Sequence, residues 1–262
     1  MRVRVIAASR ALRLALGLLT RLPVGVITPP VTEAELGRSV LFYPLVGLLI
    51  GLILIGVEWA TRTAGEALRP FLLLVVWVIL TGGLHLDGLA DAADAAVGGM
   101  GSRQRTLEIM KDPRSGPMAV TTVALLLVGK YAALFDLLRS GDFAHLLLTI
   151  PLLARLLFVA LFLTTPYASP RGMAAAAVAH LPRSQAIGVV LAMTMGVIWV
   201  NPLPAALLLL LVAGLTFLTL RRIFMRRVQG FTGDLAGALC EVNELLLLIS
   251  AAWQTTALFA AT

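Results

Sequence analysis

The chain has 262 residues, of which 59% are hydrophobic and only 13% charged, and its net charge is +7. Its mean hydropathy is +0.95, so it carries far more apolar surface than a soluble domain of this length can bury. These values exclude an ordinary soluble domain and indicate an integral membrane protein. The basic excess does not indicate a nucleic-acid partner, because membrane topology accounts for it.

Residues 3–19, the first predicted element, are expected to form an amphipathic helix on the membrane surface. Arg10 and Arg13 interrupt its apolar stretch, so we do not interpret it as a secretory signal. Together with Arg2 and Arg4, they are expected to face lipid headgroups. The alternative is an additional buried helix.

Seven apolar stretches follow, most of them of the length that crosses about 30 Å of hydrocarbon. Spanning segments must satisfy their backbone polar groups internally, so these stretches should be helices. The predicted fold is therefore a single domain over residues 1–262, an all-α polytopic membrane bundle of about seven transmembrane helices plus the N-terminal amphipathic helix. The predicted spans are 39–57, 70–86, 118–138, 145–165, 186–200, 203–220 and 235–259.

The basic residues predict the orientation of this bundle. With the N-terminus in the cytoplasm, sixteen of the 21 Lys and Arg residues would face the cytoplasm, and only Arg62, Arg69 and Arg139 would lie outside. This asymmetry follows the positive-inside rule. The longest polar connections, 87–117, 166–185 and 221–234, then face the cytoplasm, and we expect the chemistry there. The single Cys240 excludes an intramolecular disulfide.

The stretch HLDGLADAADAA, residues 85–96, places Asp87, Asp91 and Asp94 within an arc of about 60° on a helix. Stacked carboxylates repel one another and are costly near hydrocarbon, so a cation should offset them. Mg²⁺ suits such oxygen ligands, together with water and a substrate phosphate. His85 is a candidate ligand or base, or simply an interfacial residue. The alternatives for the acidic stripe are a solvated helix end or the ion relay of a transporter.

A basic loop follows the acidic stripe. Arg103, Arg105, Lys111 and Arg114 fall within a short segment and could clamp phosphate groups. For Arg103 and Arg105, a plain basic flank of the third span is an equally good explanation. Asp112 lies between Lys111 and Arg114 in a Pro/Gly turn, which indicates an ordered, functional feature.

A second acidic cluster begins the last span. Asp234, Glu241 and Glu244 share one helix face, and they could hold metal ions jointly with the first cluster. The alternative is that the two glutamates pair with polar residues inside the bundle, for which the candidates are Asn243, Lys130 and Arg155.

Five blocks of the sequence, in this order and spacing, resemble the cobalamin synthase family, adenosylcobinamide-GDP ribazoletransferase. The blocks are LLTRLPV, FYPLVGLLIG, HLDGLADAADA, EIMKDPRSG and FTGDLAGALCE. The resemblance extends over nearly the whole chain. It implies a multi-pass enzyme of the bacterial cytoplasmic (inner) membrane, with Mg²⁺ as cofactor. The implied reaction joins adenosylcobinamide-GDP to α-ribazole or its 5′-phosphate and releases GMP.

The resemblance also implies roles for the candidate residues. The implied metal ligands are Asp87, Asp91, Asp94 and Asp234, and these four together with Glu241 form the implied catalytic set. The implied substrate-binding residues are Arg103, Arg105, Lys111, Asp112, Arg114 and His85. The rival hypothesis is a proton- or cation-coupled transporter, which should carry its acids near the membrane midplane. Here the acids gather at one face beside a basic loop, which favours the transferase. The sequence does not predict an oligomeric state.

Overall fold

A computed structural model of the protein describes residues 2–139, 141, 143–169 and 172–260, with side chains for all of these except 2–6 and 255–260. The described chain is helical, and its only β-type pairing is an isolated bridge between Tyr167 and Phe231. The predicted all-α class is confirmed. The elements are α1 (Arg2–Leu19), α2 (Glu33–Ser39), η1 (Val40–Phe42), α3 (Tyr43–Thr61), α4 (Leu68–Thr81), α5 (Leu84–Gly98), α6 (Arg103–Ile109), α7 (Pro117–Arg139), α8 (Ala144–Thr164), α9 (Met173–Ala179), α10 (Arg183–Val200), α11 (Leu203–Val228) and α12 (Gly233–Ala260).

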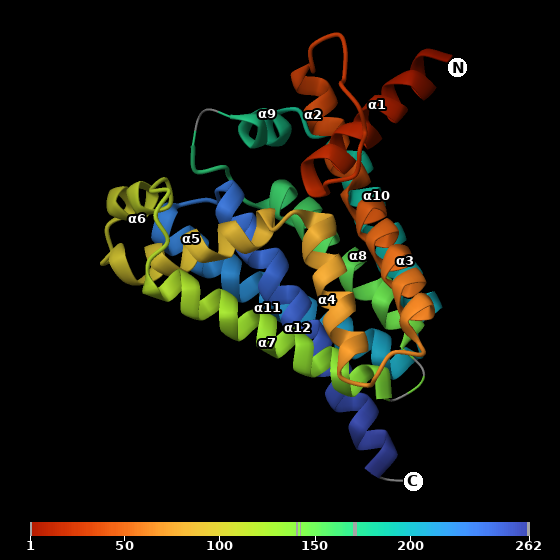
Figure 1. Ribbon diagram of the computed structural model, residues 1–262. Helices are drawn as coiled ribbons and strands as arrows, with labels where there is room; N and C mark the ends of the chain where they lie inside the picture. The colour runs from red at the N-terminus through yellow and green to blue at the C-terminus, as the bar shows by residue number, and fades with distance from the viewer. Residues whose placement is uncertain (1, 140, 142, 170–171, 261–262) are drawn as a thin grey trace.

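The helices fit a polytopic bundle. In the described part of the chain, six helices are long and apolar enough to cross a membrane, and α4 with α5 makes a seventh if this bent pair is one span. Six of these helices coincide with predicted stretches, and the bent pair of α4 and α5 begins within the remaining one, 70–86. Helices α1, α2 and α9 lie together at the top of the bundle in Figure 1, α6 lies at its left side, and α12 ends at the bottom.

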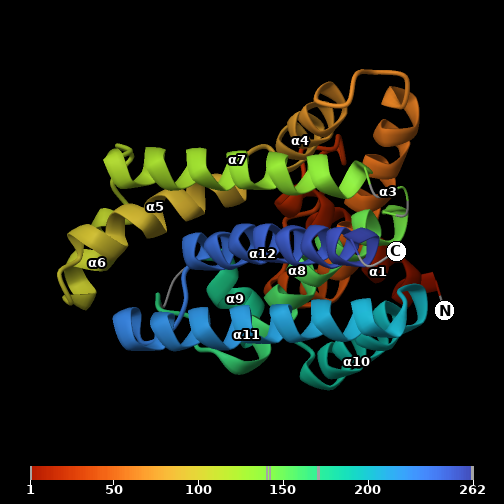
Figure 2. The ribbon, with the colours of Figure 1, turned by 90° about the horizontal axis from the view of Figure 1, so that it is seen from below.

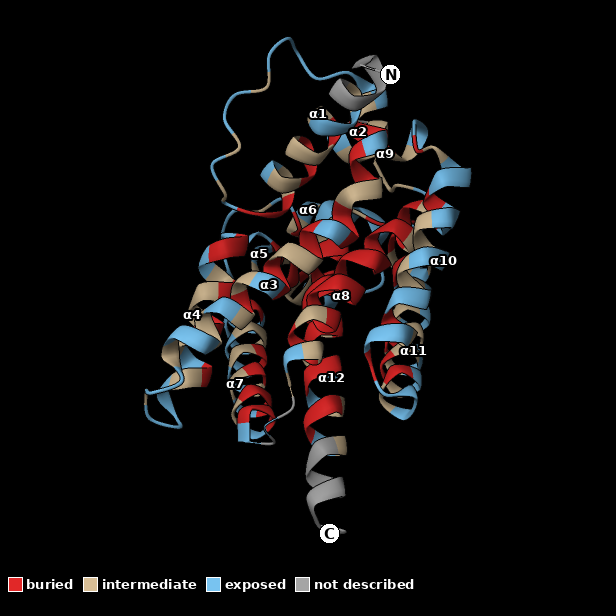
Figure 3. Cartoon of the chain, turned by 90° about the vertical axis from the view of Figure 1, so that its right-hand side faces the viewer, coloured by how far each residue is buried: buried red, intermediate tan, exposed pale blue. Residues whose placement is uncertain are grey.

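Burial divides the bundle into a centre and a lipid-facing shell (Figure 3). The apolar windows of α8 and α12 are 83% and 72% buried, whereas those of α10 and α11 are only 11% and 22% buried. Seen from below, α12 runs between α7 and α11 (Figure 2). Helices with so much exposed apolar surface need lipid as their solvent. The central position of α12 encloses the acidic residues that it carries.

Glycines of α3 allow it to pack closely on α8. Pro151 lies inside α8 and has no N–H, so the carbonyl of Leu147 loses its usual helical partner. Gly51 faces this carbonyl, and a Cβ added there would lie only 2.5 Å from the Leu147 oxygen. Gly47 makes a similar approach to the carbonyl of Pro151. Small residues thus bring the two backbones into direct contact, as membrane helix interfaces require.

The prediction of one continuous second span over 70–86 is wrong at its C-terminal end. Helix α4 stops at Thr81, and α5 turns away from it by 87°. Gly82 and Gly83 have φ values of +65° and +68°, which only glycine adopts without strain. Their N–H groups bond the carbonyls of Ile79 and Val78 and so close the helix. The aspartate stripe therefore lies on a separate helix instead of at the tip of a straight span.

Two arginines of α1 do not face lipid headgroups as predicted. Arg10 bonds the Glu35 carboxylate at 2.5 Å and the carbonyls of Thr28 and Pro29. Arg13 donates to the carbonyl of Val24 at 2.8 Å. Both guanidinium groups therefore hold the irregular segment 20–32 against α1, because its carbonyls need donors. The side chains of the other two arginines in that prediction, at positions 2 and 4, lie outside the described residues.

The α3–α8 contact predicts the effect of adding one methyl group. Gly51→Ala should destabilise the protein by roughly 1–3 kcal/mol, because the new Cβ meets backbone that cannot rotate away. Thermal unfolding in detergent measures the change. Gly56→Ala is the matched control on the same helix, since a Cβ at Gly56 has nothing within 4 Å. Equal melting of the two variants would contradict the proposed contact.

Candidate active site

The site is built where α5 crosses α12. A Cβ at Gly88 would lie 2.8 Å from the Cα of Asp234, and one at Gly237 would lie 3.2 Å from the Cα of His85. Glycine on each helix thus permits direct backbone contact. The two acidic clusters, far apart in the sequence, meet at this crossing.

Three carboxylates, those of Asp87, Asp91 and Asp234, lie near this crossing without a basic partner. The negative charges of Asp87, Asp234 and Asp94 all act on Asp91. Within the described residues, no Lys or Arg forms an ion pair with Asp87, Asp91 or Asp234. The crossing therefore holds uncompensated negative charge, which a bound cation would offset.

The donor set at the crossing fits a hard metal ion that keeps other ligands. No three His, Cys, Asp or Glu side chains in the described part of the chain gather closely enough to hold a metal ion alone. Mg²⁺ commonly binds through one or two carboxylates and completes its shell with water and substrate phosphate. Asp87, Asp91 and Asp234 provide such oxygens. The metal assignment stays a prediction.

A cavity of about 200 Å³ opens beside the crossing. The polar and charged part of its lining consists of the side chains of His85, Asp87 and Asp234 and the hydroxyl group of Tyr43. Phe158 and other apolar residues form the remaining wall, and the His85 ring lies 5.4 Å from the Phe158 ring. A small substrate group could enter here with two carboxylates on one side and an aromatic surface on the other.

Asp94, the third aspartate of the stripe, is used by the fold itself. Its carboxylate accepts hydrogen bonds from the backbone N–H groups of Gly116, at 2.5 Å, and Ala119, at 3.0 Å. It thereby caps the start of α7, where a negative charge is favourable. Its predicted role as a metal ligand has no geometric support beyond its place beside Asp91.

The predicted phosphate-binding arginines of α6 differ in their contacts. Arg103 donates to the carbonyl of Val228 at 2.9 Å and to that of Ala168 at 3.0 Å. It therefore fastens α6 to the end of α11. Arg105 makes only a loose, exposed pair with Glu108 at 3.5 Å. Both arginines are exposed, but the Arg103 guanidinium is committed to backbone carbonyls and that of Arg105 is not, and both assignments stay predictions.

The turn after α6 is ordered by its own charges. Arg114 binds Asp112 in bidentate fashion, at 2.9 Å through Nε and 2.7 Å through Nη2. This pairing lowers the pKa of the Asp112 carboxyl to about 2, so the carboxylate stays ionised at any physiological pH. The Arg114 side chain is 87% exposed, and Lys111 is exposed beside it. The turn therefore exposes two cationic side chains to solvent, at the end of the bundle that also holds the crossing of α5 and α12.

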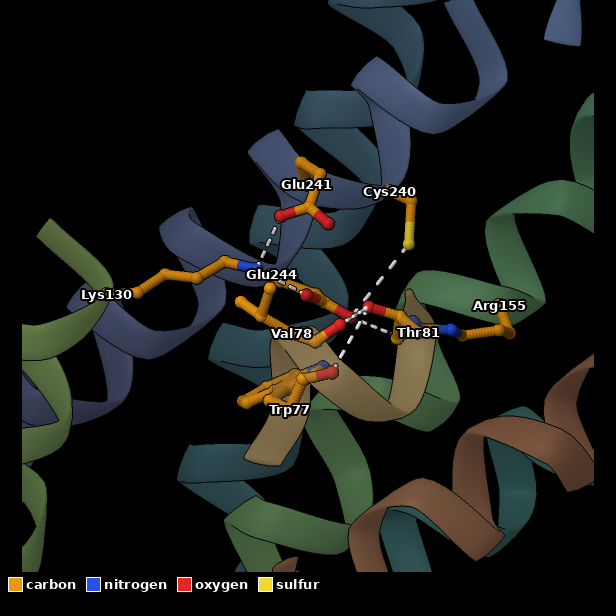
Figure 4. Close-up of polar contacts among 8 residues, drawn as sticks. All are labelled: Trp77, Val78, Thr81, Lys130, Arg155, Cys240, Glu241 and Glu244. Carbon is orange, nitrogen blue, oxygen red and sulfur yellow. Dashed lines mark hydrogen bonds and ion pairs between the residues drawn. The ribbon is translucent and has the colours of Figure 1, made fainter. Parts of the chain in front are cut away.

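Glu241 and Glu244 belong to a buried ion network, as the alternative interpretation of the sequence held (Figure 4). The Lys130 ammonium group lies 2.6 Å from a Glu241 oxygen and 2.5 Å from a Glu244 oxygen. Arg155 pairs with the other oxygen of Glu244. Glu241 lies seven residues beyond Asp234, about 10 Å along α12. The structure thus joins Glu241 to the packing of α7, α8 and α12 and does not bring it to the cavity.

Tyr167 was missed by the sequence analysis. Its backbone pairs with Phe231, where Ala168 N–H bonds the Phe231 carbonyl at 2.8 Å. Gly230 makes this possible, because a Cβ there would collide with the Pro166 carbonyl. Burial and the nearby charge of Asp234 raise the pKa of Tyr167. A phenol thus lies beside the candidate site, and the only sequence signal for it was its position in the polar connection 166–185.

The ion network predicts a large stability effect. Lys130→Met should destabilise the protein by about 3–5 kcal/mol, because it leaves the Glu241 charge buried and unpaired. Thermal unfolding of the purified protein measures the loss. The double variant Lys130→Met/Glu241→Gln should recover much of it, and Lys111→Met is the matched exposed control. A single variant as stable as the wild type would contradict the network.

Comparison with known proteins identifies the relatives of this chain. The family model of cobalamin-5-phosphate synthase matches residues 11–252. A Stutzerimonas stutzeri protein named adenosylcobinamide-GDP ribazoletransferase is 47% identical over 243 residues, which cover 93% of this chain and 98% of that protein. A Pseudomonas aeruginosa protein of the same name is 49% identical over 245 residues, covering 94% and 98%. No solved structure matches the chain.

Proposed function

Because the chain belongs to the cobalamin-5-phosphate synthase family, we propose that it joins adenosylcobinamide-GDP to α-ribazole, or to α-ribazole 5′-phosphate, and releases GMP. One structural observation supports this proposal. The contact of α5 with α12 at Gly88 brings Asp87 and Asp234 to the lining of one cavity, and Asp91 lies one helical turn beyond Asp87, within the field of both carboxylates. A basic turn lies at the same end of the bundle (Figure 1).

The proposed reaction is a displacement at phosphorus. The 5′-hydroxyl oxygen of α-ribazole forms a bond to the phosphorus esterified to cobinamide. The P–O bond to the GMP phosphate breaks, and GMP leaves with that bridging oxygen. The hydroxyl proton passes to a carboxylate of the site, for which Asp234 is the best placed, since it lines the cavity. Pyrophosphate chemistry of this kind asks the protein mainly for positioning and charge stabilisation.

Asp87 and Asp91 are the proposed holders of Mg²⁺, which leaves Asp234 to take the hydroxyl proton. The ion would neutralise charge on the pyrophosphate oxygens as the P–O bond breaks. Lys111 and Arg114 are the proposed contacts for the nucleotide end of the substrate, since both side chains are exposed at the loop. In this arrangement the carboxylates act at the reacting phosphorus, and the basic loop binds the GMP leaving group.

The proposed membrane is the bacterial cytoplasmic (inner) membrane, with the N-terminus and the site on the cytoplasmic side. Helices α1, α2 and α6, which lie in the upper part of the bundle in Figure 1, carry basic residues, among them Arg10, Arg38 and Arg105. Basic residues remain on the cytoplasmic side during insertion. Nucleotide-linked substrates are also cytoplasmic, so this orientation suits the reaction.

The first test is GMP release by the purified protein in liposomes. Adenosylcobinamide-GDP and α-ribazole together should yield GMP in the presence of Mg²⁺, and a chelator should stop the release. Omission of either substrate is the control. Chelator-resistant release would overturn the metal assignment, whereas no release from folded protein with any divalent metal would overturn the transferase and favour the transporter hypothesis.

A substitution in the acidic stripe is expected to lower turnover without destabilising the fold. Asp91→Asn should lower turnover at least about a hundredfold, because the removed charge stabilises the metal and the transition state. Expression, membrane insertion and melting temperature should stay near wild type, since Asp91 makes no ion pair in the described structure. Asp136→Asn, an exposed aspartate of α7, is the matched control. Near-normal turnover of Asp91→Asn would remove this residue from the site.

A further inference from the structure

The block LLTRLPV contains an arginine that the proposed function does not use. Arg21 follows α1, and its backbone N–H bonds the Leu80 carbonyl at 2.8 Å. Its side chain lies flat on Gly82, where an added Cβ would be 2.5 Å from the Arg21 Cγ. The side chain is therefore held at the break between α4 and α5. Leu19, two residues earlier, lines the cavity beside Asp87.

The guanidinium of Arg21 differs from those of the other arginines discussed. Arg103 donates to two backbone carbonyls, and Arg114 is paired with Asp112. The Arg21 side chain makes no hydrogen bond or ion pair with the described part of the chain. The residue is exposed beside the break, and its guanidinium donors are without a partner in the described structure.

Helix α5 begins at the same break, directly after Gly83. Its first internal hydrogen bond runs from the Asp87 N–H to the Gly83 carbonyl at 2.9 Å. The amides of residues 84–86 precede this bond and have no partner inside the helix. A helix start of this kind binds phosphate, through its free N–H groups and its partial positive charge.

His85, the second residue of α5, provides an independent indication of a ligand. The residue is only 4% exposed and lines the cavity. Its Nδ1 atom is buried and has no hydrogen-bond partner in the described structure. A buried polar atom without a partner is costly, so a ligand group that bonds it would gain that energy. A neutral imidazole can donate from Nδ1 to a phosphate oxygen.

We propose that Arg21, the N-terminus of α5 and His85 Nδ1 form a phosphate-binding corner for the pyrophosphate of the nucleotide-linked substrate. The inference rests on the proposed function for the identity of that substrate. Arg21 supplies charge and a bidentate donor, whereas the α5 amides and His85 supply neutral donors. The corner binds phosphate directly, and Asp87 and Asp234, which line the same cavity as His85, act through the metal ion or as the base. Arg21 is thus a substrate-binding residue outside the basic loop.

The corner is tested by metal-free binding of inorganic pyrophosphate. The detergent-solubilised wild type should bind labelled pyrophosphate in equilibrium dialysis with a chelator present. Arg21→Gln should weaken this binding about ten- to hundredfold, the range expected for a lost charged hydrogen bond. Arg21→Lys should retain part of it. Arg38→Gln, an exposed arginine of α2 at the same end, is the matched control and should bind as the wild type.

Steady-state kinetics separate this role from a structural one. Arg21→Gln should raise the KM for adenosylcobinamide-GDP by a similar factor and leave the KM for α-ribazole within about twofold. A rise of both KM values, or equal pyrophosphate binding by the Gln variant and the wild type, would overturn the corner. If wild-type protein releases GMP but binds no pyrophosphate without metal, the corner fails and the transferase stands. If it binds pyrophosphate through Arg21 but releases no GMP, the corner stands and the proposed reaction fails.

Discussion

The buried charges of α12 constrain the rest of the structure. Glu241 and Glu244 lie inside an apolar bundle, where an unpaired charge costs several kcal/mol. Lys130 of α7 and Arg155 of α8 offset them, so three helices must pack in one register for any of the four charges to be tolerated. This register fixes the N-terminal end of α12. The glycine contact with α5, and therefore the position of the candidate site, depends on it.

The bundle could be predicted from the sequence because apolar length alone identifies a spanning helix. The turn between α4 and α5 could not. Gly82 and Gly83 sit within an apolar run, and glycine is common inside membrane helices. Only the positive φ angles of both residues make the break. The aspartates were predicted on one helix face, and they lie there, but the direction of that helix depended on a backbone choice that composition does not reveal.

The individual roles of charged residues were the least predictable part of the site. Asp94 has the same spacing on α5 as its neighbours, yet the start of α7 uses both of its oxygens. Arg10 and Arg103 likewise bond the carbonyls of Thr28 and Ala168 in irregular segments, because loop carbonyls lack the partners that helices provide. Such bonds join residues far apart in the sequence. The pairing of Lys130 with Glu241 was foreseeable as an alternative, since a cation inside a span needs an anion.

The direction of α5 brings two chemically different kinds of group, hydrogen-bond donors and carboxylates, to the region of the cavity. If α5 continued the line of α4, its first amides would be consumed by the preceding turn and its carboxylates would run away from α12. The 87° bend frees the helix start beside Arg21 and presses Gly88 onto Asp234. His85, Asp87 and Asp234 line the cavity, and the Arg21 side chain packs on Gly82 at the break next to it. In the proposed function, a pyrophosphate with a bound divalent cation would complement the donors and the carboxylates at once, whereas a free anion or a free metal ion would satisfy only one of the two.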